Sequence, residues 1–139
     1  MKTENNLDLV KALYPNFRRY EANYNPLIES FGTVLLQVDD DSYQGDSRVL
    51  LRRGDEYGIL IFGWGSCTGC DALQGCNSYE DLEELRASLE ADIKWMSARR
   101  LLSYIRKHDW AGDFSAINPL TKQFVQDAEG IMELIANAQ

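Results

Sequence analysis

The chain has 139 residues, of which 45% are hydrophobic and 26% are charged, and this balance excludes a chain that is disordered throughout. Its net charge of −8 at pH 7 argues against direct binding of nucleic-acid phosphates or anionic lipid. No apolar run reaches the roughly 20 residues that a membrane-spanning helix needs. The N-terminal run is polar and lacks the apolar region of a secretory signal, so we expect a single domain over residues 1–139 in the cytoplasm.

Short helices are predicted before the first strand. The apolar residues of segment 5–13 predict a helix that ends before Pro15, because the residue preceding a proline is pushed out of the helical conformation. Three aromatic residues recur at helical spacing in segment 16–25 and predict a second short helix there. The asparagine–proline pair at 25–26 predicts the start of another helix, and Gly32 predicts its end.

Residues 33–38, 48–53 and 57–64 predict three β-strands. Each segment is short, rich in aliphatic and aromatic residues, and bounded by turns that contain glycine and aspartate. Strands joined by such short turns form an antiparallel meander. The apolar residues are nearly continuous along the strands, so we expect helices to cover much of both faces of the sheet.

Two helical regions follow the sheet. Apolar residues at three- and four-residue steps predict a helical region over 78–108 that begins at a Ser78 cap and has a break near Ser97. A last helix is predicted to begin at Asn118 and Pro119. The predicted fold class is therefore α+β, a three-stranded antiparallel β-meander packed with short N-terminal helices and two to three C-terminal helices.

Acidic residues are concentrated in the middle of the sequence. Residues 29–92 hold fourteen of the 22 Asp and Glu residues but four of the 14 Lys and Arg residues. This pattern is common on solvated faces, because carboxylates keep turns soluble and interact favourably with the N-terminal end of a helix. If the acidic loops and the acidic helix converge on one side, however, their potential would steer a basic partner toward them.

We therefore expect a non-enzymatic binding protein whose acidic side engages a basic protein surface of the kind that binds nucleic acid. The predicted contacts are the carboxylates of Asp39, Asp40, Asp41, Asp46, Asp55, Glu56, Glu80, Glu83 and Glu84. Trp110 and Phe114 flank a predicted turn and form a second candidate contact set, because aromatic residues are favoured at protein interfaces. The alternative for these two aromatic residues is a loop folded back over the core.

Three cysteines, Cys67, Cys70 and Cys76, lie in a glycine-rich run directly after the third predicted strand. The C-x-x-C spacing can hold zinc, with Cys76 and His108 as further candidate ligands, and it also fits a redox dithiol. We favour a third interpretation, free thiols packed as small hydrophobic residues, because free cysteine is among the most buried residue types. No cofactor is expected in that case. The alternative function is a small thiol- or zinc-dependent protein centred on this run.

The run GWGSCTGCDALQGC at residues 63–76 resembles a G-x-G-S-C-x-G-C-D-A-L signature of small uncharacterised proteins of bacteria and their phages. The resemblance covers about residues 63–85 and implies no activity, cofactor or catalytic residue. It favours an accessory protein of a phage or mobile element, a class in which inhibitors of host defence, such as anti-CRISPR proteins, are common. The expected form of binding is then inhibition of a nucleic-acid-handling or host-defence complex.

Overall fold

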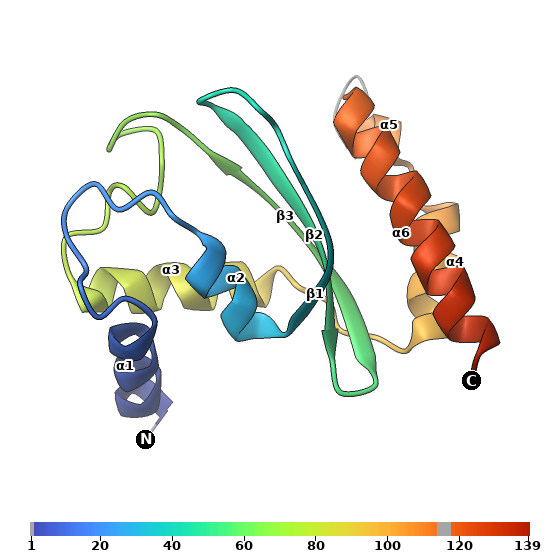
Figure 1. The fold of residues 1–139 in the computed structure, drawn as a ribbon, viewed down its shortest axis with the longest axis horizontal. Helices are drawn as coiled ribbons and strands as arrows, with labels where there is room; N and C mark the ends of the chain where they lie inside the picture. Colours follow the sequence, from blue (N-terminus) through green and yellow to red (C-terminus); the bar gives the residue numbers. More distant parts are fainter. Residues whose placement is uncertain (1, 114–117) are drawn as a thin grey trace.

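The computed structural model describes residues 2–113 and 118–139 (Figure 1). Three strands form one antiparallel sheet in the order β1-β2-β3, in which β1 is Thr33–Asp39, β2 is Gly45–Arg53 and β3 is Glu56–Trp64. The predicted α+β fold class is confirmed, since this meander is preceded by short helices and followed by longer ones.

Two helices precede the sheet and four follow it in the described residues. Their bounds are Lys2–Leu13 (α1), Asn25–Phe31 (α2), Tyr79–Ala91 (α3), Ala98–Lys107 (α4), Trp110–Asp113 (α5) and Pro119–Asn137 (α6). None of these described helices combines the length and the apolar character that crossing a membrane requires.

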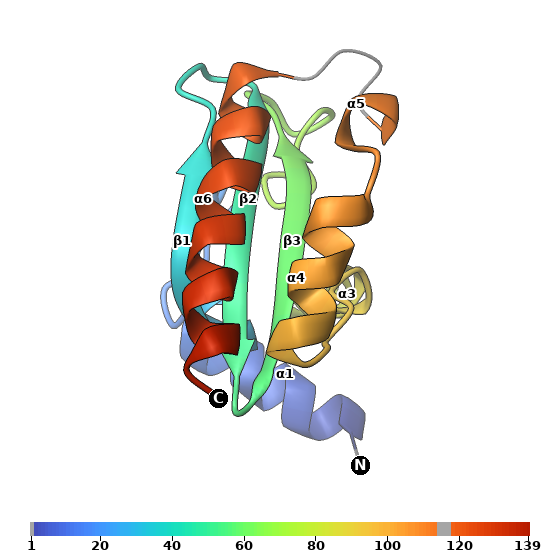
Figure 2. The same cartoon turned by 90° about the vertical axis from the view of Figure 1, so that its right-hand side faces the viewer.

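The sheet lies between two layers of helices. In Figure 1, α1, α2 and α3 lie on one side of the sheet and α4 and α6 on the other, and Figure 2 shows α4 and α6 side by side across the second face. The protein has two hydrophobic cores, a first core between the sheet and α1, α2 and α3, and a second core between the sheet and α4 and α6. Because side chains alternate along a strand, Leu60 and Phe62 of β3 lie in the first core, and Tyr57 and Ile59 lie in the second. Coverage of both faces explains why the strands are almost continuously apolar.

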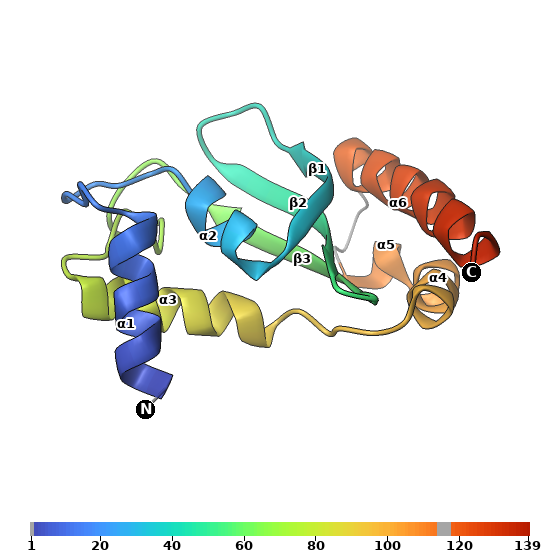
Figure 3. The same ribbon diagram turned by 60° about the horizontal axis from the view of Figure 1, so that its bottom comes forward.

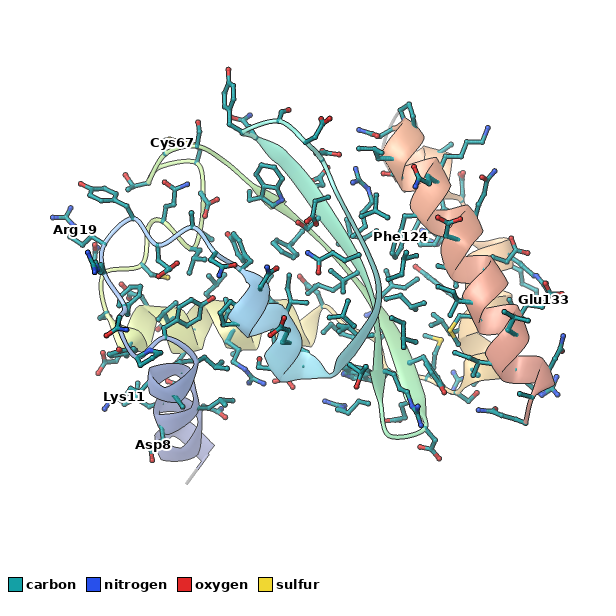
Figure 4. All side chains as sticks on the ribbon, in the orientation of Figure 1. Asp8, Lys11, Arg19, Cys67, Phe124 and Glu133 are labelled. Carbon is teal, nitrogen blue, oxygen red and sulfur yellow. A yellow bond between two sulfur atoms is a disulfide. The ribbon has the colours of Figure 1, made fainter. Side chains whose placement is uncertain are left out.

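The last helix, α6, begins where the sequence predicts it, because the side chain of Asn118 accepts a hydrogen bond from the backbone N–H of Leu120 at 2.7 Å. From residue 124 onward, its buried residues recur at steps of four and face the sheet. They are Phe124, Ala128, Met132 and Ala136. Figure 4 shows Phe124 directed toward the sheet and Glu133 directed away from it.

A buried ion pair connects the loop of the β1–β2 hairpin to α6. Arg48 of β2 is fully buried, and its Nη2 lies 3.0 Å from Oδ1 of Asp40. Its Nε donates a hydrogen bond to Oγ1 of Thr121 in α6 at 2.7 Å. Oδ2 of Asp40 accepts from the backbone N–H of Asp46 at 2.9 Å. Because an unpaired buried charge is strongly unfavourable, these contacts hold the hairpin loop in one position relative to α6.

The helix predicted over residues 16–25 is wrong, because this segment is irregular up to the start of α2. Tyr20 has a φ of 67°, a left-handed conformation that an α-helix does not contain. The aromatic side chains of this segment also pack against different parts of the protein. Phe17 packs on Tyr79 of α3 with ring centroids 5.5 Å apart, whereas Tyr24 is buried in the first core. Long-range packing therefore overrides the helical spacing of these residues.

The predicted 78–108 helical region is two helices separated by residues 92–97, which we call the connector. In the connector, Met96 exchanges two backbone hydrogen bonds with Tyr57 of β3, at 2.8 and 3.0 Å. Ile93 packs closely on Gly58. A Cβ atom added at Gly58 would lie 2.5 Å from Cγ2 of Ile93. The break near Ser97 is confirmed, but α3 ends earlier than its apolar stripe predicts because the connector pairs with the edge of β3.

Replacing Phe124 by Ala should lower the free energy of unfolding by about 3–5 kcal/mol, because it removes a fully buried ring between α6 and the sheet. Leu134→Ala on the same helix is the control. Leu134 is 74% exposed, so its truncation should change the stability by less than about 0.5 kcal/mol. Urea unfolding followed by circular dichroism measures both effects, and equal losses would contradict the orientation of α6.

Candidate functional site

The glycine-rich run after β3 forms a loop at residues 65–77, which we call the disulfide loop. Cys67 and Cys70 are joined by a disulfide with Cα atoms 5.3 Å apart, and both residues are exposed. Figure 4 shows Cys67 at the outer turn of this loop. Cys76 is free and buried, and burial raises the pKa of its thiol to about 11. The prediction of buried free thiols is thus confirmed for Cys76 and wrong for the other two, which lie on a turn that faces solvent.

The carboxylate of Asp71 organises the disulfide loop from the inside. Asp71 is buried, and its Oδ1 accepts hydrogen bonds from the backbone N–H groups of Leu73 at 2.9 Å and Gln74 at 3.1 Å. Its Oδ2 accepts from the N–H of Gly65 at 2.9 Å. The hydroxyl of Tyr24 donates to Oδ1 at 2.9 Å from the segment before α2. Four donors satisfy a buried carboxylate that would otherwise be strongly unfavourable, and they tie the loop to the rest of the protein.

Tyr24 and Gly65 are matched to this arrangement. Burial raises the pKa of the Tyr24 phenol well above its ordinary value, and the neighbouring Asp71 acts in the same direction, so the phenol stays protonated and donates. At Gly65, a Cβ would lie 2.6 Å from the carbonyl oxygen of Cys70 and 2.9 Å from its Sγ. Only glycine allows such a close approach. The presence of glycine at position 65 and of aspartate at position 71 therefore has a structural explanation.

A cleft of about 480 Å³ lies between the disulfide loop, the β1–β2 hairpin and residues 22–25. Acidic and aromatic side chains share its lining. They are the side chains of Asp39, Asp40, Tyr43, Trp64 and Asp71. The cleft is therefore built from three segments that are far apart in the sequence, and it is the candidate functional site.

Among the acidic residues that line the cleft, Asp39 is held in place by a neutral hydrogen-bond donor and has no ion-pair partner of its own in the described residues. Asp40 is held in its ion pair with Arg48, and Asp71 is enclosed by its four donors. Asp39 is exposed and accepts hydrogen bonds from Nε2 of Gln37 at 3.1 and 3.2 Å. Because the amide of Gln37 carries no net charge, the full negative charge of Asp39 faces the cleft.

Two aromatic residues of the cleft were not assigned from the sequence. The indole N–H of Trp64 donates to Oγ of Ser47 at 2.8 Å, which fixes the ring at the end of β3. Tyr43 is 81% exposed in the β1–β2 loop. A signal for both was available, since Trp64 stands within the glycine-rich run and Tyr43 stands in a polar loop that offers an aromatic ring no core to join.

The nine predicted carboxylate contacts fall into three groups. The groups are Asp39, Asp40, Asp41 and Asp46; Asp55 and Glu56; and Glu80, Glu83 and Glu84. In the first group, Asp39 and Asp40 line the cleft, whereas Asp41 and Asp46 belong to the same hairpin but not to the lining. The third group lies on the first half of α3, where Glu84 lines a hollow next to Cys70. The second group lies at the opposite end of the sheet in Figure 1, because successive hairpins of a meander point in opposite directions. The structure therefore does not bring all nine together.

Of the two predicted aromatic contacts, the structure describes Trp110, which lies apart from the cleft. Trp110 is half-buried at the start of α5, on the α4 side of the sheet, and its Nε1 donates to the carbonyl oxygen of Ile105 at 3.0 Å. Phe114 lies outside the described residues. Trp110 and the predicted acidic residues beside the cleft therefore do not form one surface.

The four candidate zinc ligands do not come together. Cys67 and Cys70 are bonded to each other, Cys76 is part of the first core, and His108 caps the C-terminal end of α4 on the other side of the sheet. Among the described residues, no group of three or more His, Cys, Asp or Glu side chains could hold a metal ion. The spacing of the cysteines did not reveal this, because the positions of Cys76 and His108 depend on packing.

Comparison of the chain with known protein families, with curated proteins and with solved structures gives no match.

Replacing Asp71 by Asn should lower the free energy of unfolding by about 2–3 kcal/mol, because an amide cannot accept from four donors and leaves buried N–H groups unpaired. Tyr24→Phe removes one of these donors and should cost about 1 kcal/mol. Asp55→Asn in the exposed β2–β3 turn is the control and should change the stability by less than about 0.5 kcal/mol. Urea unfolding measures all three. An Asp71→Asn variant as stable as the native protein would show that this carboxylate does not organise the loop.

Proposed function

We propose that this protein is a non-enzymatic binding protein that uses the acidic cleft to engage a positively charged surface of another protein. The observation that supports this proposal is the presence of the exposed Asp39 carboxylate and the rings of Tyr43 and Trp64 in one cleft. A carboxylate accepts charge-assisted hydrogen bonds from arginine and lysine, and aromatic faces attract the same cations. This combination suits a guanidinium or ammonium group.

The cleft is also ordered before a ligand arrives. Gln37 orients Asp39, Ser47 fixes the ring of Trp64, and Asp71 holds the wall formed by the disulfide loop. Preorganised groups lose little conformational entropy on binding, so more of the interaction energy is available as affinity. The net charge of −8 adds a long-range attraction that increases the rate of encounter with a cationic partner.

The partner that fits this chemistry best is a cationic groove that normally holds a phosphate backbone, because such grooves present many arginine and lysine side chains together. A protein that occupies the groove competes with the nucleic acid. The proposed function is therefore inhibition of a nucleic-acid-handling complex. The resemblance of the 63–76 run to proteins of bacteria and phages supports a host-defence complex as the target.

Asp39→Asn should weaken binding of a short arginine-rich peptide by roughly fivefold, because it removes the available charge of the cleft and keeps the shape of the side chain. Tyr43→Ala should weaken the affinity by about threefold through loss of a cation–π contact. Asp55→Asn removes the same charge at the opposite end of the sheet and is the matched control, which should leave the affinity unchanged within about twofold.

Fluorescence anisotropy with a labelled peptide measures these affinities over a series of NaCl concentrations. Affinity should fall as salt rises, because counterions screen the attraction. Equal losses for Asp39→Asn and Asp55→Asn would show that binding follows net charge rather than the cleft, and would contradict the proposal.

A second candidate function, a thiol-dependent one, is favoured by a different observation. Cys67 and Cys70 form an exposed disulfide on a turn, where a partner thiol can reach the sulfur atoms. The disulfide loop also forms one wall of the cleft. The thiol-dependent function requires the sulfur atoms of Cys67 and Cys70, whereas the binding function requires only that the loop keeps its position.

The double variant Cys67→Ser, Cys70→Ser separates the two. Under the binding function, the affinity for the arginine-rich peptide should stay within about twofold of the native value, because Asp71 holds the loop through contacts that do not involve the disulfide. Native protein reduced with a phosphine should behave in the same way. Loss of peptide binding in both samples, with the fold intact by circular dichroism, would favour the thiol-dependent function.

A further inference from the structure

The outer edge of β3 offers backbone groups that no described strand uses. Tyr57 directs its N–H and C=O away from β2, since both bond to Met96 of the connector. Backbone groups alternate along a strand and β3 pairs with β2 without a register shift, so Ile59, Ile61 and Gly63 direct theirs the same way. Within the described residues, the Tyr57–Met96 bridge is the one pairing found on this edge.

The two edges of the sheet differ in regularity. The pairing of β1 with β2 is irregular between Val34 and Leu36, and such a bulge distorts an edge and discourages further pairing. The edge of β3 has no such irregularity over its nine residues. A regular strand edge is a template for the backbone of another strand.

An apolar groove of about 540 Å³ runs beside this edge, between β3, the connector and α4. Figure 3 shows the connector passing alongside β3 to reach α4. The apolar residues that line the groove are Ile59, Ile61, Met96, Leu101, Tyr104 and Trp110. Residues 59 and 61 face the α4 side of the sheet, so a strand added to β3 would place every second side chain over the groove.

Aromatic rings form one end of the groove. The ring of Trp110 lies 4.6 Å from that of His108 and 5.9 Å from that of Tyr104, measured between centroids. The bond from Nε1 of Trp110 to the carbonyl oxygen of Ile105 fixes the indole. Rigid, half-exposed aromatic residues of this kind often dominate the energy of an interface. The predicted role of Trp110 as a contact residue therefore has a site on this face.

The charge around the groove is opposite to that of the protein as a whole. Lys94 lines the groove, and Arg100 and Lys107 line an adjoining hollow that shares Met96 and Tyr104 with it. Among the side chains that the structure describes, Asp92 is the acidic one that lines either of them. In a chain of net charge −8, this cationic border favours an acidic occupant. A second copy of the same groove would bring cations against cations, so complementarity favours a different protein.

We infer that this protein binds an extended segment of another protein as an added strand along β3, with alternate apolar side chains in the groove and Asp or Glu residues beside Lys94, Arg100 and Lys107. The main-chain hydrogen bonds would go to Ile59, Ile61 and Gly63. This surface lies on the α4 side of the sheet, and the acidic cleft lies on the other. The two sites therefore bind ligands of opposite charge, and each can fail independently of the other.

The first test is selection of random displayed peptides on the full-length protein. The expected peptides carry apolar residues at alternate positions flanked by Asp or Glu. Bound to the protein, a selected peptide should slow amide hydrogen exchange at Ile59, Ile61 and Gly63 by more than about tenfold and leave the already paired Leu60 and Phe62 unchanged. Peptides without this pattern, or protection that does not reach residues 59, 61 and 63, would overturn the inference.

The second test uses variants of exposed residues that should not affect folding. Arg100→Glu and Lys107→Glu should each weaken the affinity for the selected peptide by roughly two- to fivefold, which is the range of an exposed ion pair. Lys122→Glu on α6 makes the same change of charge away from the groove and should have no effect. Equal effects of all three would contradict the assigned border. Protection of residues 59, 61 and 63 that increases with protein concentration in the absence of peptide would overturn the inference, because the occupant would be a second copy of this chain.

Discussion

A buried carboxylate needs hydrogen-bond donors, and the way in which Asp71 obtains them decides the shape of the disulfide loop and of the cleft beside it. Two donors come from its own turn, one from Gly65 where the loop leaves β3, and one from Tyr24 in a segment that precedes the sheet. Because all four must be present together, the loop can adopt few other arrangements. The cleft exists because these contacts fix one wall at a set distance from the β1–β2 hairpin.

The opposite wall is fixed in a similar way. Arg48 has no access to solvent, so it requires Asp40 and Thr121 as partners, and these hold the hairpin against α6. Asp40 is thereby neutralised, whereas its neighbour Asp39 keeps its charge toward the cleft. Adjacent acidic residues that look equivalent in the sequence thus have different roles, one in the fold and one available to a ligand. The same distinction explains why the number of acidic residues is a poor guide to a binding site.

The sheet separates two surfaces of different chemistry. On the side of α2, the cleft presents a carboxylate and two aromatic rings, which suit a cation. On the side of α4, the edge of β3 presents backbone groups, an apolar groove and a cationic border, which suit an acidic strand. A small protein with two such faces can contact two partners, or two parts of one partner, at the same time. The binding function proposed above uses one of these surfaces for a cation and the other for an acidic strand.

The sequence by itself determined the elements whose signals are local. The three strands, the Ser78 and Asn118 caps and the apolar face of α6 follow from patterns within a few residues, and the structure confirms them. It did not determine the irregular segment 16–25, the early end of α3, the joining of Cys67 to Cys70 or the separation of Asp55 from the hairpin acids. The first two depend on a partner distant in the sequence, Tyr79 for Phe17 and Tyr57 for Met96. Local spacing describes what one segment can do, whereas burial and hydrogen bonding across the sheet select which of those possibilities is realised.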